Sequence, residues 1–249
     1  MTGSKEDYFA LLGPLRELGW SVTAVDLPGM AESEGGDDPE LYALDALAGD
    51  VLDLARWVGG GQPIHLVGHS VGGLISREAV LTDPESFASL TLYASGPGKV
   101  GDEAAASAVM LTSALYSLGT SQVYDLKLAL NAELGFEPPD ADIAHFLRQR
   151  WVDTSPGHFL GMAAIALAET DRVADLAELD DTPLLVLFGT LDQTWPQTQL
   201  RGYGPAIGAE TVLIEGAGHS PAVESPAQMV SALDSFWHRV DETQSMQTE

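Results

Sequence analysis

The sequence has no cysteine and few basic residues. Without cysteine the chain can form no disulfide, no thiolate zinc site and no cysteine nucleophile. Its 11 Lys and Arg against 37 Asp and Glu give a net charge of −26, which argues against a nucleic-acid partner or an anionic membrane surface. No apolar run approaches the roughly 18 residues of a membrane span. Residues 1–13 lack the basic-then-apolar order of a signal peptide, so we expect a cytoplasmic location.

Length and composition instead indicate one large globular domain, or a core domain with an insertion. The chain has 249 residues, of which 45% are hydrophobic and 19% charged. These values exclude a disordered chain, a collagen and a coiled coil. A chain of this length buries roughly 70–75% of its unfolded surface, so it needs no metal or disulfide for stability.

Short apolar strands alternate with amphipathic helices along most of the chain. The pattern predicts strands at 21–26, 64–67, 90–93, 184–188 and 211–214, and helices at 7–18, 41–58, 74–82, 197–206 and 226–240. This order is typical of an α/β fold whose mostly parallel sheet has helices on both faces. Residues 101–181 have helical patterns and no strand, so we expect them to form an insertion over a site beyond the strand ends.

A glycine-rich turn, Gly68-His69-Ser70-Val71-Gly72, connects a predicted strand to a predicted helix. A sharp turn of this kind strains its middle residue and brings chain segments close together, so glycine is expected on either side. The turn projects the Ser70 hydroxyl outward at a helix N-terminus, where free N–H groups favour negative charge. The amide of Val71 is then one expected oxyanion donor. The alternative is a purely structural turn.

A serine nucleophile needs a base that is oriented by a carboxylate. Asp192 comes four residues after the predicted strand 184–188, and His219 comes just after the strand 211–214. The chain order serine, aspartate, histidine is the order of α/β-hydrolases. The structural alternatives are a helix-cap or turn role for Asp192 and a tight-turn role for His219.

With these motifs in place, the chain resembles the α/β-hydrolase superfamily, of the small capped bacterial type. The matching stretches run through nearly the whole chain at 26–29, 68–73, 188–192 and 216–219. The resemblance implies that Ser70 is the nucleophile, that His219 is general base and then acid, and that Asp192 orients the histidine. It implies no metal and no organic cofactor.

The resemblance also implies a domain division and a departure at the N-terminus. Residues 1–98 and 183–249 would form the hydrolase core, and 99–182 a helical cap. Family members carry two or three strands and a His-Gly dipeptide before the segment that matches 3–9, so we expect those strands to be missing here. Met1 then falls at the second oxyanion position. We interpret the chain as starting at an internal methionine of a longer protein; the alternative is that 21–26 pairs directly with 64–67.

The predicted function is a serine hydrolase that cleaves a small-molecule carboxylic ester, thioester or lactone through an acyl-enzyme on Ser70. Side chains expected to line the substrate pocket are His69, Ser95, Met110, Trp151, Phe159 and Trp195, although ordinary packing is an alternative for most of those in the cap. Two other functions stay open. One is a carbon–carbon bond hydrolase or lyase that uses the same three residues, and the other is a non-catalytic ligand-binding or inactive protein of the same fold.

Overall fold

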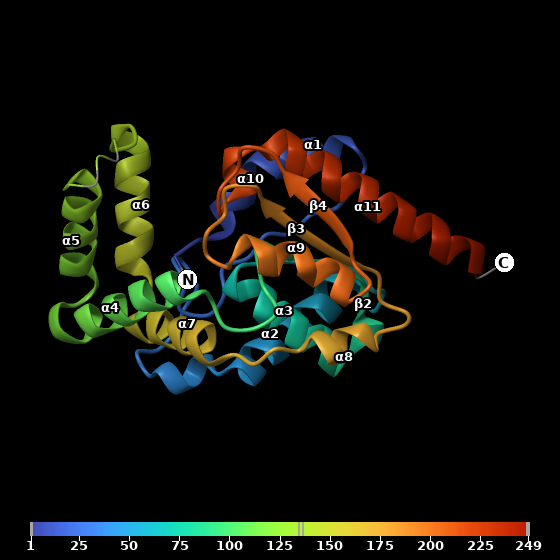
Figure 1. Ribbon diagram of the computed structural model, residues 1–249, viewed down its shortest axis with the longest axis horizontal. Helices are drawn as coiled ribbons and strands as arrows, with labels where there is room; N and C mark the ends of the chain where they lie inside the picture. The colour runs from blue at the N-terminus through green and yellow to red at the C-terminus, as the bar shows by residue number, and fades with distance from the viewer. Residues whose placement is uncertain (1, 134, 136, 248–249) are drawn as a thin grey trace.

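Four parallel strands form a single sheet at the centre of the molecule (Figure 1). The computed structural model describes residues 2–133, 135 and 137–247. The sheet has the order β1-β2-β3-β4, with β1 at Ile64–His69, β2 at Phe87–Tyr93, β3 at Leu184–Gly189 and β4 at Glu210–Ile214. Because all neighbours pair in parallel, the carboxyl ends of the four strands meet at one edge.

Helices cover both faces of this sheet (Figure 1). One face packs against α2 (Leu44–Gly59), α3 (Val71–Thr82), α7 (Pro156–Ala168), α8 (Val173–Ala177) and α9 (Gln197–Ala206). The other packs against α1 (Phe9–Glu17), α10 (Pro221–Glu224) and α11 (Pro226–Gln247). Short 3-10 helices lie at η1 (Lys5–Tyr8), η2 (Pro39–Tyr42) and η3 (Pro84–Ser86). None of the helices in the described part of the chain combines the length and apolar character of a membrane span.

Strand β3 explains why the sheet needs two helical layers. All six of its residues are buried. Val186 and Phe188 point into the cluster that contains α2 and α3, whereas Leu185 and Leu187 point into the cluster that contains α1 and α11. Burying each such side chain contributes about 1.5–3 kcal/mol, so neither face of the strand is stable in water. The predicted α/β fold with a parallel, doubly covered sheet is confirmed.

The predicted strand at 21–26 is wrong. Residues 20–27 form neither helix nor strand, and among the described residues β1 pairs only with β2. The direct pairing of 21–26 with 64–67 is therefore also absent from the described structure. Trp20 instead docks on α11, where its Nε1 donates to Asp234 Oδ1 at 2.8 Å and its ring lies 5.2 Å from that of Trp237. The β-branched residues favour an extended backbone, but they do not supply a neighbouring strand.

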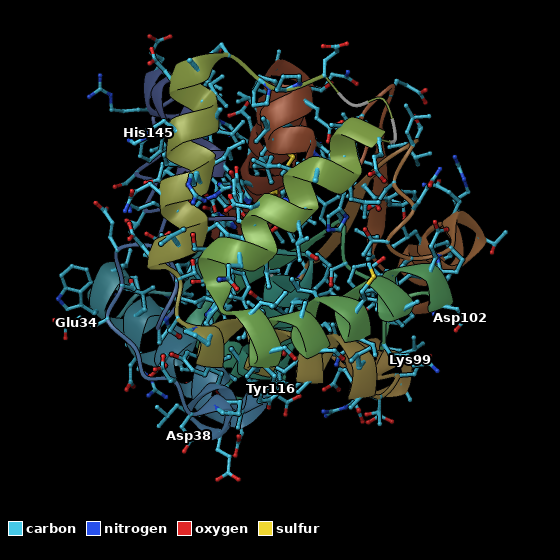
Figure 2. All side chains as sticks on the ribbon, turned by 90° about the vertical axis from the view of Figure 1, so that its left-hand side faces the viewer. Glu34, Asp38, Lys99, Asp102, Tyr116 and His145 are labelled. Atoms are coloured by element: carbon cyan, nitrogen blue, oxygen red, sulfur yellow. The ribbon has the colours of Figure 1, made fainter. Side chains whose placement is uncertain are left out.

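The region between β2 and β3 is helical, as predicted for 101–181, with no strand in its described residues. Helices α4 (Asp102–Leu118), α5 (Thr120–Glu133) and α6 (Ala141–Asp153) stand to one side of the sheet and share their own apolar cluster with Phe159 (Figure 1). Tyr116 on α4 and His145 on α6 are exposed on this side (Figure 2). By contrast, Met162 of α7 and Leu176 of α8 belong to the main core. The division at residues 99 and 182 stays a prediction.

The segments that enter and leave this helical region, residues 97–99 and 169–172, are hydrogen-bonded to each other. Lys99 N donates to Glu169 O at 2.9 Å, and Arg172 N donates to Pro97 O at 3.3 Å. Arg77 of α3, which is fully buried, joins both: its guanidinium donates to Pro97 O at 2.5 Å and to Glu169 Oε1 at 2.8 Å. We call these contacts the neck. It ties the helical region directly to the helix that follows Ser70.

Candidate active site

Ser70 sits at the turn between β1 and α3 with a strained backbone. Its φ of 56° and ψ of −124° place it in a region that costs a non-glycine residue about 1–3 kcal/mol. Two backbone hydrogen bonds hold it there: Ser70 N donates to Tyr93 O at 2.9 Å, and Gly73 N donates to Ser70 O at 2.9 Å. The hydroxyl is thereby held beyond the carboxyl ends of β1 and β2.

The glycines required by this turn differ from those expected. A Cβ on Gly68 would lie 2.7 Å from Gly72 O, and a Cβ on Gly73 would lie 2.5 Å from the Cβ of Ser95. A Cβ on Gly72 would meet nothing within 4 Å. The expectation of a small residue on either side of Ser70 therefore holds for Gly68, but the close approach on the other side is at Gly73.

Replacing Gly73 by alanine is expected to lower the free energy of unfolding by about 1–3 kcal/mol, because Ser95 and the turn must move apart. The matched control, Gly72→Ala, is expected to change it by no more than about 1 kcal/mol, in the stabilising direction, because alanine favours a helix over glycine. Urea unfolding followed by circular dichroism measures both. Equal destabilisation by the two variants would contradict this account of the turn.

The structure brings Ser70, His219 and Asp192 into one chain of hydrogen bonds. His219 Nε2 lies 2.9 Å from Ser70 Oγ, and His219 Nδ1 lies 3.0 and 3.1 Å from the two carboxylate oxygens of Asp192. Because a carboxylate only accepts, Nδ1 carries the imidazole proton and Nε2 is left to accept from the serine hydroxyl. The three residues come from the ends of β1, β3 and β4, which explains why they meet at one edge of the sheet.

Asp192 is buried yet ionised. Burial alone would raise the pKa of its carboxyl, but the hydrogen bond and charge of His219, together with the Thr194 N–H at 2.9 Å from Oδ1, hold that pKa below its usual value. Gln197 Nε2 also donates to the backbone carbonyl of Asp192 at 2.7 Å and fixes the loop. A negative charge is therefore kept next to His219, whose own side chain is one-third exposed.

His69 contacts His219 through the backbone. Its Nε2–H donates to His219 O at 2.8 Å, and its ring stacks on Tyr93 with centroids 4.2 Å apart. Burial, followed by the proximity of His219, lowers the pKa of His69 to about 3, so this imidazole is neutral near pH 7. Tyr93 OH accepts a hydrogen bond from Ala222 N at 2.9 Å. Sequence reasoning missed Tyr93, because an aromatic at the end of a buried strand carries no local signal.

Of the two predicted oxyanion donors, the structure describes Val71, whose donor role stays a prediction. Val71 is the first residue of α3, where a helix N–H has no partner one turn earlier, and its amide directly follows Ser70. Met1 lies outside the described residues.

Two other predicted pocket residues lie next to this group. Trp195 is fully buried, donates from Nε1 to Gly98 O at 3.1 Å, and has its ring centroid 6.4 Å from that of His219. Ser95 is buried against Gly73.

Three further residues predicted to line the pocket, Met110, Trp151 and Phe159, lie on α4, α6 and α7, and their role in a pocket stays a prediction. Trp151 and Phe159 are buried against each other, with ring centroids 4.7 Å apart, in the cluster shared by α4–α6. Met110 is 60% exposed on α4.

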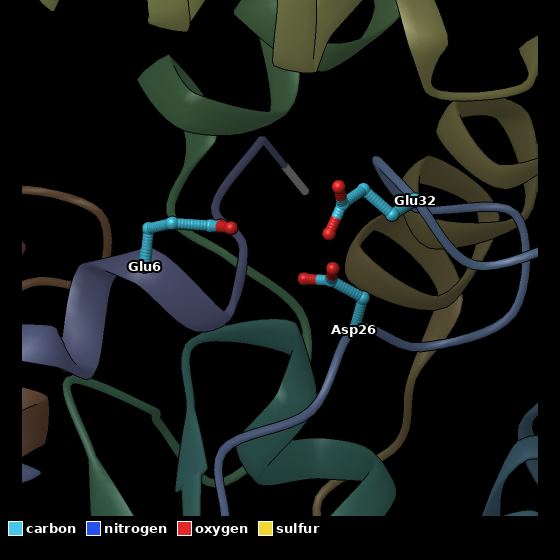
Figure 3. Close-up of side chains that lie close together, drawn as sticks. All are labelled: Glu6, Asp26 and Glu32. Carbon is cyan, nitrogen blue, oxygen red and sulfur yellow. The ribbon is translucent and has the colours of Figure 1, made fainter.

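Three acidic side chains lie close enough to share a metal ion: Glu6, Asp26 and Glu32 (Figure 3). Lys5 Nζ lies among them, 2.6 Å from Asp26 Oδ2, 2.6 Å from Glu32 Oε2 and 3.1 Å from Glu6 Oε1. The hydrogen bond to Asp26, followed by that to Glu32, raises the pKa of Lys5. An ammonium group thus already balances these carboxylates, and they link η1 to the loop after residue 26.

Most of the chain is similar to known proteins. Residues 2–232 match a family described as "Alpha/beta hydrolase family", and the chain belongs to this family. It is 28% identical over 225 residues to a pimeloyl-[acyl-carrier protein] methyl ester esterase of Aeromonas hydrophila, covering 87% of this chain and 85% of that one. It is 31% identical over 229 residues to the dihydrolipoyllysine-residue acetyltransferase component of an acetoin cleaving system of Pseudomonas putida, covering 86% of this chain and 55% of that protein.

A solved structure shares the fold. A thermophilic esterase from Thermogutta terrifontis has a TM-score of 0.77 and 20% identity, and the match covers 95% of this chain and 86% of that chain. The family and the esterase of Aeromonas hydrophila support a hydrolase.

Proposed function

We propose that this protein is a serine hydrolase that cleaves a carboxylic ester, thioester or lactone through an acyl-enzyme on Ser70. The observation that carries the proposal is the chain of hydrogen bonds from Ser70 Oγ through His219 to the ionised Asp192. A serine, a base and an orienting carboxylate in this geometry are the parts that nucleophilic acyl transfer needs. The name of the Aeromonas relative, a methyl ester esterase, supports a carboxylic ester as the first substrate class.

In the proposed first half-reaction, Ser70 Oγ attacks the substrate carbonyl carbon while His219 Nε2 takes the hydroxyl proton. Asp192 stabilises the imidazolium that forms. The carbonyl oxygen becomes an oxyanion next to the Val71 N–H at the positive end of α3. One such donor contributes about 2.7–4 kcal/mol to transition-state stabilisation.

Collapse of this oxyanion intermediate completes the first half-reaction and forms the acyl-enzyme. His219 gives its proton to the leaving alcohol or thiol, which departs, or to the ring oxygen of a lactone, which becomes a hydroxyl at the far end of the acyl group on Ser70. Water then attacks the acyl carbonyl while His219 Nε2 accepts a proton from it, and the acid is released as Ser70 regains its proton. Neutral His69 takes no part in these proton transfers because its pKa is about 3.

A fluorophosphonate probe tests the proposal directly, because it reacts with serine hydroxyls that a neighbouring base activates. We expect one adduct per chain in the intact mass, located on the peptide that contains Ser70, and no adduct on a urea-unfolded sample. Absence of an adduct on a chain whose circular dichroism shows it to be folded would contradict the proposal and favour a non-catalytic protein.

A further inference from the structure

The carboxylate of Glu224 binds the backbone on both sides of His219. Glu224 Oε2 accepts from Gly218 N at 2.6 Å, and Glu224 Oε1 accepts from Ser220 N at 2.8 Å. Both oxygens of one side chain are therefore used on the two residues that flank the histidine. Hydrogen bonds from an amide to an ionised carboxylate are about twice as strong as those between neutral groups.

Other hydrogen bonds hold the first part of the loop that carries His219: Gly216 N donates to Thr190 Oγ1 at 3.0 Å, and Leu191 N donates to Ala217 O at 2.8 Å. In the described part of the chain, the amides of Gly218 and Ser220 bond only to Glu224. The loop runs from the end of β4 to the start of α10 and contains Gly216, at φ 76°, as well as Gly218. Glycines leave a backbone free to adopt many conformations. Asp192 orients the His219 ring and His69 holds its carbonyl oxygen, but neither binds the amides on either side.

A role in starting helix α10 accounts for only one of the two bonds. Ser220 is the N-cap of α10, and its N–H is a group that a helix start leaves unpaired. Gly218 lies two residues before that cap, so its N–H does not belong to the helix. The bond to Gly218 reaches past the helix to the far side of His219.

We propose that Glu224 is a positioning residue for His219, which holds the imidazole within reach of Ser70 Oγ by fixing the peptide units on both sides of it. The inference rests on the proposed function for its catalytic consequence. A displacement of about 1 Å at a reacting group lowers a rate by about 100-fold. Loss of Glu224 is therefore expected to act on kcat more than on KM, since both oxygens of its carboxylate bind the backbone beside His219.

Glu224→Ala is expected to lower kcat for p-nitrophenyl acetate by about 10- to 100-fold and to change KM by less than about 2-fold. Glu224→Gln retains one oxygen that can accept, so it should restore part of the rate. The matched control is Glu215→Gln, which removes the same charge from an exposed residue of the same loop whose carboxylate makes no hydrogen bond within the described residues. That control should behave as wild type.

Proton NMR of His219 Nδ1–H provides a readout that does not depend on turnover. The hydrogen bond to Asp192 protects this proton from exchange, and we expect its downfield signal to broaden or vanish in Glu224→Ala and to persist in Glu215→Gln. Two results would overturn the inference. One is an unchanged Nδ1–H signal in Glu224→Ala. The other is a loss of kcat no larger than the fraction of that variant that urea titrations show to be unfolded under the assay conditions. A wild type that turns over no ester and takes no fluorophosphonate contradicts the proposed function instead, and the NMR comparison still decides the role of Glu224.

Discussion

Replacing Ser70 by alanine is expected to lower kcat for p-nitrophenyl acetate by at least about 10⁵-fold. The variant keeps His219, Asp192 and the Val71 amide but has no atom that can attack the carbonyl carbon. Stopped-flow or extended steady-state assays at a single pH measure the loss. The fluorophosphonate adduct should disappear in the same variant.

The backbone strain at residue 70 should not itself change the stability difference between the wild type and Ser70→Ala. Alanine at position 70 must adopt the same φ of 56° as serine, so the strain is common to both proteins and their unfolding midpoints should agree closely. The matched control is Ser231→Ala, on the exposed face of α11, which should retain full activity. Retention of more than a few per cent of the activity in Ser70→Ala would show that another group is the nucleophile.

His219→Ala is expected to produce a loss of the same order as Ser70→Ala, and the double variant should lose no more than either alone. Nucleophile and base act as one unit, so removal of either leaves only the oxyanion donor and substrate binding. Asp192→Asn is expected to lose less, about 10⁴-fold, because the histidine is still present but is held in the wrong tautomer. A double-mutant cycle on kcat/KM measures the coupling.

The control for the second prediction is His145→Ala, an exposed histidine on α6 (Figure 2). It should leave kcat/KM unchanged. If the losses in Ser70→Ala and His219→Ala multiply in the double variant, the two residues act independently and the proposed proton transfer between them is wrong.

Much of the fold follows from local patterns in the chain. The run of apolar residues in β3 predicts a strand covered on both faces, and all six residues of that strand are buried. The same reasoning fails at 21–26, because a strand exists only when another strand pairs with it, and this information is not local. Sequence periodicity thus predicts which segments are extended better than it predicts which segments pair.

The site shows the same limit at the level of side chains. Ser70, Asp192 and His219 could be predicted to meet because each follows a strand, and parallel strands end at one edge of a sheet. The supporting residues could not. Glu224 bonds backbone amides of the loop that carries His219, and Tyr93 bonds the backbone of α10 just after it. Such bonds depend on the path of the chain in space rather than on spacing along it.

The hydrogen bonds of the neck bear on whether the helical region could be replaced by one of another length. Because Lys99 N donates to Glu169 O, the two ends of residues 100–168 lie next to each other. A segment of another length could therefore replace α4–α6 without changing the separation of these two ends, provided that α7, which packs in the main core, is kept. Arg77 would hold any replacement that keeps Pro97 and Glu169 in register with α3. Such a replacement would leave the groups at the strand ends unaltered.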